Sequence, residues 1–352
     1  MTETEINKKV VVAMSGGVDS SVTSLLLMEQ GYEVTGLTAV IHPAGHDAAK
    51  KARKTCGELG IRHEVLDLQE VFKKSVINYF EESYKKGLTP NPCAFCNRAI
   101  KWGDLKIFAL QKFGTDLYAT GHYAQIKEHD GSYKLYRAED LQKDQSYMLY
   151  GLTQEDLART IFPLGGLKKT QIKEIAGEHG LSSVSQKESQ DVCFIIPPET
   201  NSSYLINKFG EQEGDIVEFK TEKVLGRHKG TFNYTIGQRK GIKVSAAEPL
   251  YVVSLEPEQN RIYVGYKQDL FSSEFDVTNV NWQQVCEQES FPAMVKIRYN
   301  SPAQRAEIFK TKENAVHVKL NEPKDAITPG QIAVFYDLEN TYLLGGGVIK
   351  YS

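Results

Sequence analysis

The chain of 352 residues contains little cysteine, with five residues, and no long apolar run. Its apolar runs, such as residues 10–14, are far shorter than the roughly 18 residues of a membrane helix, so we expect no membrane-spanning helix. Five cysteines are too few for a disulfide scaffold, and an odd number leaves one unpaired. The first nine residues are polar and lack an apolar signal core, which predicts a cytoplasmic protein.

A strong charge imbalance is also missing, because the net charge is −3 at pH 7. The whole-chain charge therefore does not indicate a nucleic-acid-binding protein. One stretch, residues 223–243, nevertheless combines basic residues with Phe232 and Tyr234 and contains no Asp or Glu. It fits a solvated face of a β-domain as well as a nucleic-acid surface. Its basic residues are Lys223, Arg227, Lys229, Arg239, Lys240 and Lys243.

The first part of the chain, up to about residue 196, alternates short apolar strands with helices. We predict strands at 9–14, 33–40, 62–66 and 116–120. We predict helices at 20–29, 47–59 and 69–85, and another from the Pro-rich turn at 89–92 to about residue 113. This alternation predicts βαβ units, and hence an α/β domain with a mainly parallel sheet.

After Pro197-Pro198 the pattern changes to short β-rich runs, with almost no helical periodicity. Turn residues separate these runs at spacings typical of small barrels. A weak seam near 268–276 divides them, so we predict three domains at 1–196, 197–267 and 268–352, the last barrel-like. The predicted strands are 215–219, 232–236, 250–255, 261–266, 294–299, 305–309, 315–320, 332–336 and 342–345.

The Gly-rich segment at 15–21, SGGVDSS, directly follows a predicted strand and precedes a predicted helix. Glycines let the backbone approach a ligand closely, and the N–H groups at a helix N-terminus bind anions. No lysine ends the loop, so it is not the common G-x-x-x-x-G-K-[ST] phosphate loop. The pattern S-G-G-x-D-S is the signature of pyrophosphate-loop ATPases, which cleave ATP between its α and β phosphates and adenylate a substrate.

Three cysteines lie in segments that could carry chemistry. Cys93 and Cys96 form C-x-x-C within NPCAFCN, a spacing that suits a metal or a redox pair. A zinc site usually needs two further ligands, and the chain has no second C-x-x-C. Cys193 lies in the apolar, strand-like segment SQDVCFI and is either a buried structural cysteine or a functional one. We interpret Cys56 and Cys286 as structural.

Together these motifs resemble the bacterial tRNA-specific 2-thiouridylase family over essentially the whole chain. The pyrophosphate loop alone is shared with several synthetases, but its combination with two separate cysteine motifs is far more specific. The matching segments are AMSGGVDSSV (13–22), TPNPCAFCN (89–97), ATGHYA (119–124), KDQSYML (143–149), KESQDVCFI (187–195), YTIGQRKG (234–241), KIRY (296–299), TPGQIAVFYD (328–337) and LGGGVI (344–349).

The resemblance implies a tRNA-uridine 2-sulfurtransferase that acts on the wobble uridine, position 34, of the tRNAs for Lys, Glu and Gln. In this family ATP with Mg²⁺ adenylates the uracil oxygen, and sulfur then replaces it. The implied partners are tRNA and a sulfur donor, either a cysteine desulfurase or a sulfur-relay protein. Asp19 is the implied candidate for holding Mg²⁺ near the phosphates. The implied ATP-binding residues are Ala13, Met14, Ser15, Gly16, Gly17, Val18, Asp19, Ser20, Ala39 and Gly121.

The resemblance also assigns roles to the cysteines. Cys193 aligns with the cysteine that carries a persulfide, and Cys96 with its partner, which attacks the Cys193–sulfur linkage or forms a disulfide with Cys193. Many family members have Asp at the position of Cys93. Three cysteines suit a [4Fe-4S] cluster with one open iron, so the cluster stands as the alternative to the persulfide route.

For tRNA, the resemblance places Asn91, Pro92 and Cys93 near the target base and the basic stretch at 223–243 near phosphates, in a central β-rich domain that binds tRNA. Two other classes of function remain open: a pyrophosphate-loop ligase for a small molecule, and a tRNA-binding protein without catalysis. The other implied tRNA-binding residues are His122, Lys143, Asp144, Gln145, Arg298, Tyr299 and Gln331.

Overall fold

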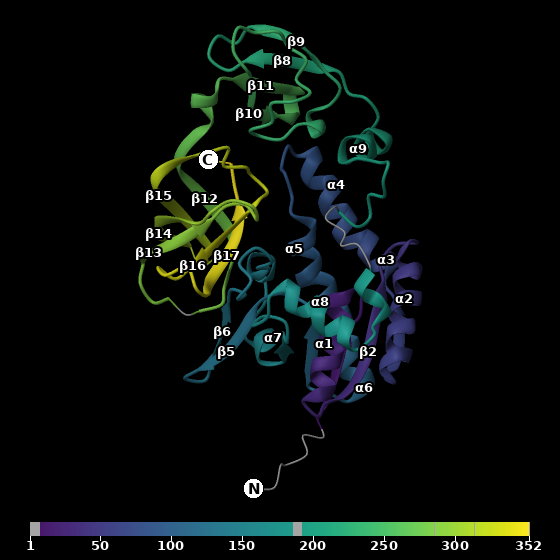
Figure 1. Cartoon of the computed structure of the whole chain (residues 1–352). Coiled ribbons are helices and arrows are strands. Elements are labelled where there is room, and N and C mark those ends of the chain that lie inside the picture. The colour runs from purple at the N-terminus through teal and green to yellow at the C-terminus, as the bar shows by residue number, and fades with distance from the viewer. Residues whose placement is uncertain (1–7, 186–191, 285, 313, 352) are drawn as a thin grey trace.

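The computed structural model describes residues 8–185, 192–284, 286–312 and 314–351. Figure 1 shows an α/β part with the N-terminus, a small sheet at the top and a barrel beside them. The predicted fold class, a parallel α/β sheet followed by two β-rich parts, is confirmed. No helix of the described residues is long and apolar enough to cross a membrane. The domain limits at 196 and 267 stay predictions.

The N-terminal sheet has five strands in the order β3-β2-β1-β4-β7, and every neighbouring pair is parallel. Its central strand β1 is buried because Val10, Val11 and Val12 are apolar on both faces, as a covered parallel sheet requires. All carboxyl ends therefore open at one edge, where such sheets bind ligands. The strands are β1 Lys9–Ala13, β2 Glu33–Val40, β3 Arg62–Asp67, β4 Leu117–Thr120 and β7 Thr160–Ile161.

All four helices predicted for this part are present in the expected order, with local irregularities, and α7 and α8 follow them. The predicted helix at 69–85 is continuous but has a π-helical stretch at Lys73–Ile77. The helix predicted to reach 113 is bent at Gly103, whose φ −83° and ψ −112° are not helical. The α-helices are α1 Val18–Glu29, α2 Gly45–Leu59, α3 Gln69–Phe72, α4 Asn78–Lys85, α5 Pro92–Cys96, α6 Lys106–Phe113, α7 Gln154–Ala158, α8 Lys169–Glu178 and α9 Asn201–Phe209.

Two expectations for the chain beyond residue 197 are wrong. Residues 201–209 form α9, whose N-cap Thr200 makes a capping box with Ser203. Leu205 is the one residue of this helix that is buried. Such a short buried stripe leaves almost no helical period in the sequence. Residues 232–236 are not a strand, because Phe232 packs near α9 while Tyr234 packs in the core of the central sheet.

The central sheet has the order β10-β11-β8-β9, with the β11–β8 pair parallel and the other two pairs antiparallel. Short 3-10 turns occur both in this central part and in the α/β part. The strands are β8 Gly214–Glu218, β9 Val224–His228, β10 Tyr251–Glu256 and β11 Arg261–Gly265. The 3-10 turns are Ser146–Leu149, Ser182–Ser185, Thr231–Asn233, Pro257–Gln259 and Lys267–Leu270.

The C-terminal part is a closed barrel that packs directly on the α/β part. Asn281 Nδ2 donates to the carbonyls of Tyr150 and Leu152, and Tyr147 donates its hydroxyl to Ile332 O at 2.8 Å. The first strand of the barrel, β12, begins at Phe271, within the predicted seam near 268–276. The barrel strands are β12 Phe271–Trp282, β13 Ser290–Lys296, β14 Gln304–Lys312, β15 Ala315–Asp325, β16 Ile332–Tyr336 and β17 Leu343–Ile349, and a separate hairpin is formed by β5 Gln125–His129 and β6 Ser132–Tyr136.

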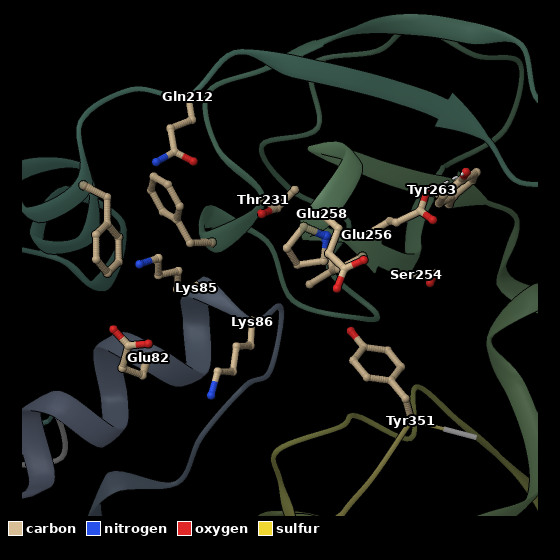
Figure 2. A pocket seen from close by; sticks show the side chains of 14 residues that line it. Glu82, Lys85, Lys86, Gln212, Thr231, Ser254, Glu256, Glu258, Tyr263 and Tyr351 are labelled. Atoms are coloured by element: carbon tan, nitrogen blue, oxygen red, sulfur yellow. Dashed lines mark hydrogen bonds between the residues drawn. The ribbon is translucent and has the colours of Figure 1, made fainter.

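The three parts meet near the end of α4. A cavity of about 700 Å³ lies there. Figure 2 shows Lys85 and Lys86 on one side of it, Glu256 on another and Tyr351 from the C-terminal segment below them. Gly87 lies against the central sheet so closely that a Cβ would come within 2.8 Å of Pro257 Cγ. The loop after α4 therefore runs through the junction of all three parts.

Candidate functional site

One cleft of about 740 Å³ at the carboxyl edge of the parallel sheet gathers residues from both separate cysteine motifs and from the pyrophosphate loop. Its residues come from α1, from α5 and the segment after it, and from the loops after β4 and α8. The predicted site residues that line it are Asp19, Pro92, Cys93, Cys96, His122, Lys143, Gln145, Cys193 and Tyr299.

The pyrophosphate loop is held by its own serines. Ser15 N donates to Ser20 Oγ at 3.2 Å, and Ser20 Oγ donates to Gly17 O at 3.1 Å. Gly17 caps α1 with no side-chain hydrogen bond, which leaves the helix N-terminus open to an anion. Gly16 has φ +76°, and a Cβ there would lie 2.8 Å from Lys51 Cβ, so this turn requires glycine.

Asp19 is the charged side chain of this loop, and its carboxylate is already bound. Lys169 Nζ donates to both carboxylate oxygens, at 2.7 and 2.9 Å, and the Tyr123 hydroxyl donates to Oδ1 at 2.6 Å. A single carboxylate beside a phosphate site suits Mg²⁺ held partly by ATP, in which case the cation would compete with Lys169. Sequence reasoning assigned no role to Lys169 or Tyr123, although Tyr123 lies in the matching segment ATGHYA (119–124).

The remaining predicted ATP residues take different positions. Gly121 follows β4, and a Cβ there would lie 3.0 Å from Asp19 C and 3.1 Å from Ser20 N, so it lets β4 approach the start of α1. The Met14 side chain is buried behind the sheet, where Ser24 Oγ donates to its sulfur. The other predicted ATP residues lie at the end of β1, at the start of α1 and near the end of β2: Ala13, Val18 and Ala39.

Cys93 and Cys96 are brought to one face by α5. Asn91 accepts the Ala94 N–H at 3.0 Å as N-cap, and Pro92 follows at the first helical position. Residues three apart on a helix share a face, so both thiols point to the same side. Cys93 is exposed and Cys96 is buried.

Cys193 enters the cleft from the segment after α8. It lies in a turn and not in the strand-like context that we expected. Phe194 anchors this turn, with its ring 5.8 Å from the ring of Phe72 and 5.2 Å from that of Phe80. Cys193 itself is exposed. The preceding part of its motif, residues 187–191, lies outside the described residues.

The thiols of the cleft are poor acids here, because surrounding protein excludes water from their charged forms. Burial raises the pKa of Cys96 to about 12 and that of Cys193 to about 11, and it raises the pKa of Cys93 as well. The positive charge of Lys101 opposes this rise at all three thiols. Lys101 lies five residues after Cys96 and was not singled out from the sequence.

Lys101 is oriented by His122. Lys101 Nζ lies 3.2 Å from His122 Nε2, and His122 Nδ1 lies 2.7 Å from Thr120 Oγ1. Because an ammonium can only donate, Nε2 accepts and Nδ1 carries the proton toward Thr120. Burial, together with the charge of Lys101, holds the pKa of His122 well below its ordinary value, so the ring is neutral.

The three cysteines do not fit an iron–sulfur cluster as they are placed. Within the described ranges, no group of three Cys, His, Asp or Glu side chains is close enough to hold a metal ion. Cys93, Cys96 and Cys193 line the same cleft without gathering at one point.

The segment 143–145 is divided between the cleft and the interior. Lys143 and Gln145 line the cleft, and Gln145 Oε1 also accepts the Tyr123 N–H at 3.0 Å. Asp144 is buried, and its carboxylate accepts hydrogen bonds from Arg137 Nε at 2.8 Å and from two backbone N–H groups. The Asp144 side chain thus holds the loop and does not face the cleft.

The three predicted tRNA-binding residues of the C-terminal part lie in different surroundings. Tyr299 lines the cleft, and Lys296 Nζ lies 5.5 Å from its ring centre. Arg298 donates to Asp325 O at 2.7 Å. Gln331 donates to Thr89 O at 2.8 Å, in the loop before α5.

Acidic side chains neutralise part of the positive charge of the basic stretch at 223–243. Arg227 pairs with Asp215 at 2.6 Å, and Lys229 pairs with Glu211 at 2.7 Å. Arg239 and Lys240 are exposed, and neither has an ion pair in the part of the chain that the structure describes. The loop around Arg239 is therefore the more available phosphate contact.

Family models match three successive segments of the chain. The tRNA methyl transferase HUP domain matches residues 8–197, the tRNA methyl transferase PRC-barrel domain matches 202–266, and the aminomethyltransferase beta-barrel domain matches 272–349. The first model alone covers more than half of the chain and contains the whole pyrophosphate loop and all three cysteines of the cleft.

Curated relatives match over nearly the full length. The tRNA-specific 2-thiouridylase MnmA of Gloeothece citriformis is 44% identical over 97% of this chain and 99% of its own, and that of Rippkaea orientalis is 45% identical over the same shares. A solved 4-thiouridine synthetase–RNA complex with bound ATP matches at 22% identity and TM-score 0.36, over 53% of this chain and 44% of that one.

Proposed function

The chain belongs to the tRNA-specific 2-thiouridylase family, and from this premise we propose that it thiolates the 2-position of uridine 34 in tRNA at the expense of ATP. The observation that carries the proposal is the single cleft where Asp19 of the pyrophosphate loop meets Cys96 and Cys193. A small-molecule ligase needs no such pair of thiols. A binding protein needs no open pyrophosphate loop.

In the first step, ATP binds with its phosphates at the N-terminus of α1. The backbone around Gly16 and Gly17 and the serine hydroxyls supply donors, and Lys169 supplies positive charge close to Asp19. Mg²⁺ held with ATP at Asp19 would neutralise phosphate charge. The uracil O2 attacks the α phosphate, so that pyrophosphate leaves and the oxygen becomes part of an adenylate.

In the second step, a persulfide on Cys193 supplies sulfur. Its terminal sulfur attacks C2 of the base and AMP leaves with the former oxygen. The Cys96 thiolate then attacks Cys193 Sγ, which breaks the bond to the transferred sulfur and leaves its electron pair on the thiouridine. A Cys96–Cys193 disulfide remains, and a thiol reductant must return it to two thiols. Lys101 is placed to stabilise the anionic sulfur.

The macromolecular partners follow from this chemistry. We propose that tRNAs for Lys, Glu and Gln are the substrates and that a cysteine desulfurase or a sulfur-relay protein loads Cys193. An anticodon base can leave its stack to enter the cleft, since single-stranded loop bases are readily extruded. Cys93, exposed one turn before Cys96, lies where the base would approach.

The test is single-turnover thiolation of tRNA with ATP and a persulfide donor. Cys193→Ser and Cys96→Ser should each lower the rate at least about a hundredfold, while Cys286→Ser, a barrel cysteine outside the cleft, should stay within about twofold. Full activity of Cys193→Ser would refute both proposed sulfur steps. Turnover of a small acceptor by the double variant would favour the ligase.

Iron analysis separates the persulfide route from the cluster. After anaerobic purification we expect no stoichiometric iron or acid-labile sulfide, and thiolation that needs only a persulfide donor. About four irons per chain, lost in Cys93→Ser, would instead establish a three-cysteine cluster.

A further inference from the structure

The loop of residues 87–91, between α4 and α5, is held by a turn from the barrel. The Thr89 N–H donates to Pro329 O at 2.9 Å, and Gln331 Nε2 donates to Thr89 O at 2.8 Å. Both backbone groups of Thr89 are thus bonded to the turn that enters β16. Gln331 Nε2 also lies 3.4 Å from Pro90 O.

The backbone of the barrel turn at Gly330 packs directly against the backbone of the loop at Thr89. Gly330, between the two bonding residues, has φ +88°, and a Cβ there would lie 2.8 Å from Thr89 N and 2.9 Å from Leu88 Cβ. Only glycine fits both the conformation and the space. The contact is therefore built by the local sequence on both sides and is not a loose surface encounter.

The other parts of the chain hold the same loop. Thr89 Oγ1 donates to Thr235 Oγ1 at 3.4 Å, which ties it to the segment beside the central sheet. Tyr351, at the edge of the cavity in Figure 2, donates its hydroxyl to Gly87 O at 2.9 Å. Segments from the central part and from the C-terminal part therefore both hold this loop of the α/β part.

This loop leads directly into the cysteine helix. Asn91 caps α5, and Cys93 is the second residue of that helix. Pro90 and Pro92 fix two φ angles and restrict the residues before them, which makes the link from Thr89 to Cys93 stiff. A displacement at Thr89 is consequently passed to the thiols.

We propose that Gln331 is a positioning residue for the sulfur-transfer step: through Thr89 it sets the place of Cys93 and Cys96 in the cleft. This deepens the proposed function and rests on it, because it names the step that Gln331 serves. It also reassigns a side chain that the sequence associated with tRNA binding. Its amide is committed to the protein's own backbone.

The decisive variant is Gln331→Glu, which keeps the shape but replaces the donor with a carboxylate against the Thr89 carbonyl. The matched control is Gln304→Glu, the same change on strand β14, which does not line the cleft. There Gln304 Nε2 donates a hydrogen bond of 2.7 Å to Glu322 O. Each full-length variant is compared with wild type by tRNA binding, tRNA-dependent exchange of pyrophosphate with ATP, and single-turnover thiolation.

For Gln331→Glu we expect sulfur transfer at saturating tRNA to slow roughly ten- to hundredfold. The Kd for tRNA and the pyrophosphate exchange should stay within about twofold, because adenylation precedes the step that needs the thiols. Hydrogen–deuterium exchange of peptides covering 87–97 should accelerate in this variant and not in Gln304→Glu. A purely structural defect would lower all three activities together.

A raised Kd for tRNA with an unchanged saturating rate would overturn the inference and return Gln331 to an RNA contact. Unchanged exchange at 87–97 would overturn it as well. If wild type fails to thiolate tRNA, the proposed function fails, and hydrogen exchange still decides whether Gln331 holds the loop.

Discussion

At the scale of single residues, the cleft combines thiols in unequal surroundings with one nearby cation. Cys96 is buried while Cys93 and Cys193 are exposed, yet protein raises the pKa of all three. A cysteine that must accept sulfur from a partner needs access, whereas one that attacks its neighbour does not. The exposure of Cys193 and the burial of Cys96 agree with the proposed roles.

Alkylation should distinguish the two thiols. Because the thiolate is the reactive form, and because Cys193 is exposed while burial raises the pKa of Cys96 above that of Cys193, we expect Cys193 to react with iodoacetamide severalfold faster than Cys96 at pH 8. Peptide-resolved mass spectrometry over time measures both rates in one sample. Equal rates would contradict the burial argument.

His122 should make the fold sensitive to acid. Its pKa is lowered in the folded state, so between that value and about 6.5 the unfolded state binds the extra proton and stability falls as pH falls. We expect His122→Asn to remove up to about 1.4 kcal/mol per pH unit of this slope below pH 6.5.

Urea unfolding at pH 7.5, 6.5 and 5.5 measures that slope. His129→Asn is the matched control, because His129 is exposed on the β5–β6 hairpin. An unchanged slope in the His122 variant would show that its ring is already charged in the folded protein.

At the scale of elements, the pyrophosphate loop shows how local sequence builds a site. The S-G-G-x-D-S pattern, placed between strand and helix, was sufficient to predict both the turn and the open helix N-terminus. The same reasoning missed α9, whose buried stripe is too short to show a period, and β12, which starts within the predicted seam. Elements with a strong local pattern were predictable, whereas elements determined by distant packing, whether short like α9 or long like β12, were not.

Two glycine substitutions on neighbouring elements should act in opposite directions. Gly16→Ala puts a Cβ against α2 at a positive φ, so we expect ATP affinity to fall at least about tenfold and stability to fall by about 1–3 kcal/mol. Gly57→Ala, inside α2 with nothing near its Cβ, should raise stability by roughly 0.5–1 kcal/mol with ATP binding unchanged.

Calorimetric titration with ATP and thermal unfolding measure both effects. Normal ATP binding by Gly16→Ala would mean that the loop does not hold phosphates in this conformation.

At the scale of the whole molecule, the three parts act together because the cleft and its supporting loop draw on all of them. Tyr299 of the barrel lines the cleft, and Thr235 beside the central sheet holds Thr89. RNA contacts are expected on the exposed basic loop around Arg239 and Lys240 in the central part. Binding of tRNA should therefore depend on salt.

The salt dependence should locate that contact. Replacing both Arg239 and Lys240 with Ala should reduce the slope of log K against log salt by roughly 1.4–1.8, at about 0.7–0.9 per lost phosphate contact. Arg227→Ala should change the slope less, because Arg227 is paired with Asp215. Fluorescence anisotropy at several salt concentrations measures the slopes, and equal slopes for both variants would exclude the loop.

The sequence by itself was enough to establish the α/β and β-rich architecture, the pyrophosphate loop and the three candidate cysteines, because these depend on local pattern: periodicity, turn residues and motif spacing. Folding was needed to bring Cys93, Cys96 and Cys193 to one cleft, to pair Asp19 with Lys169, to bury Asp144 and to direct Gln331 at Thr89. These contacts join residues far apart in the chain, where no local propensity acts and only the packing of the three parts brings the groups together.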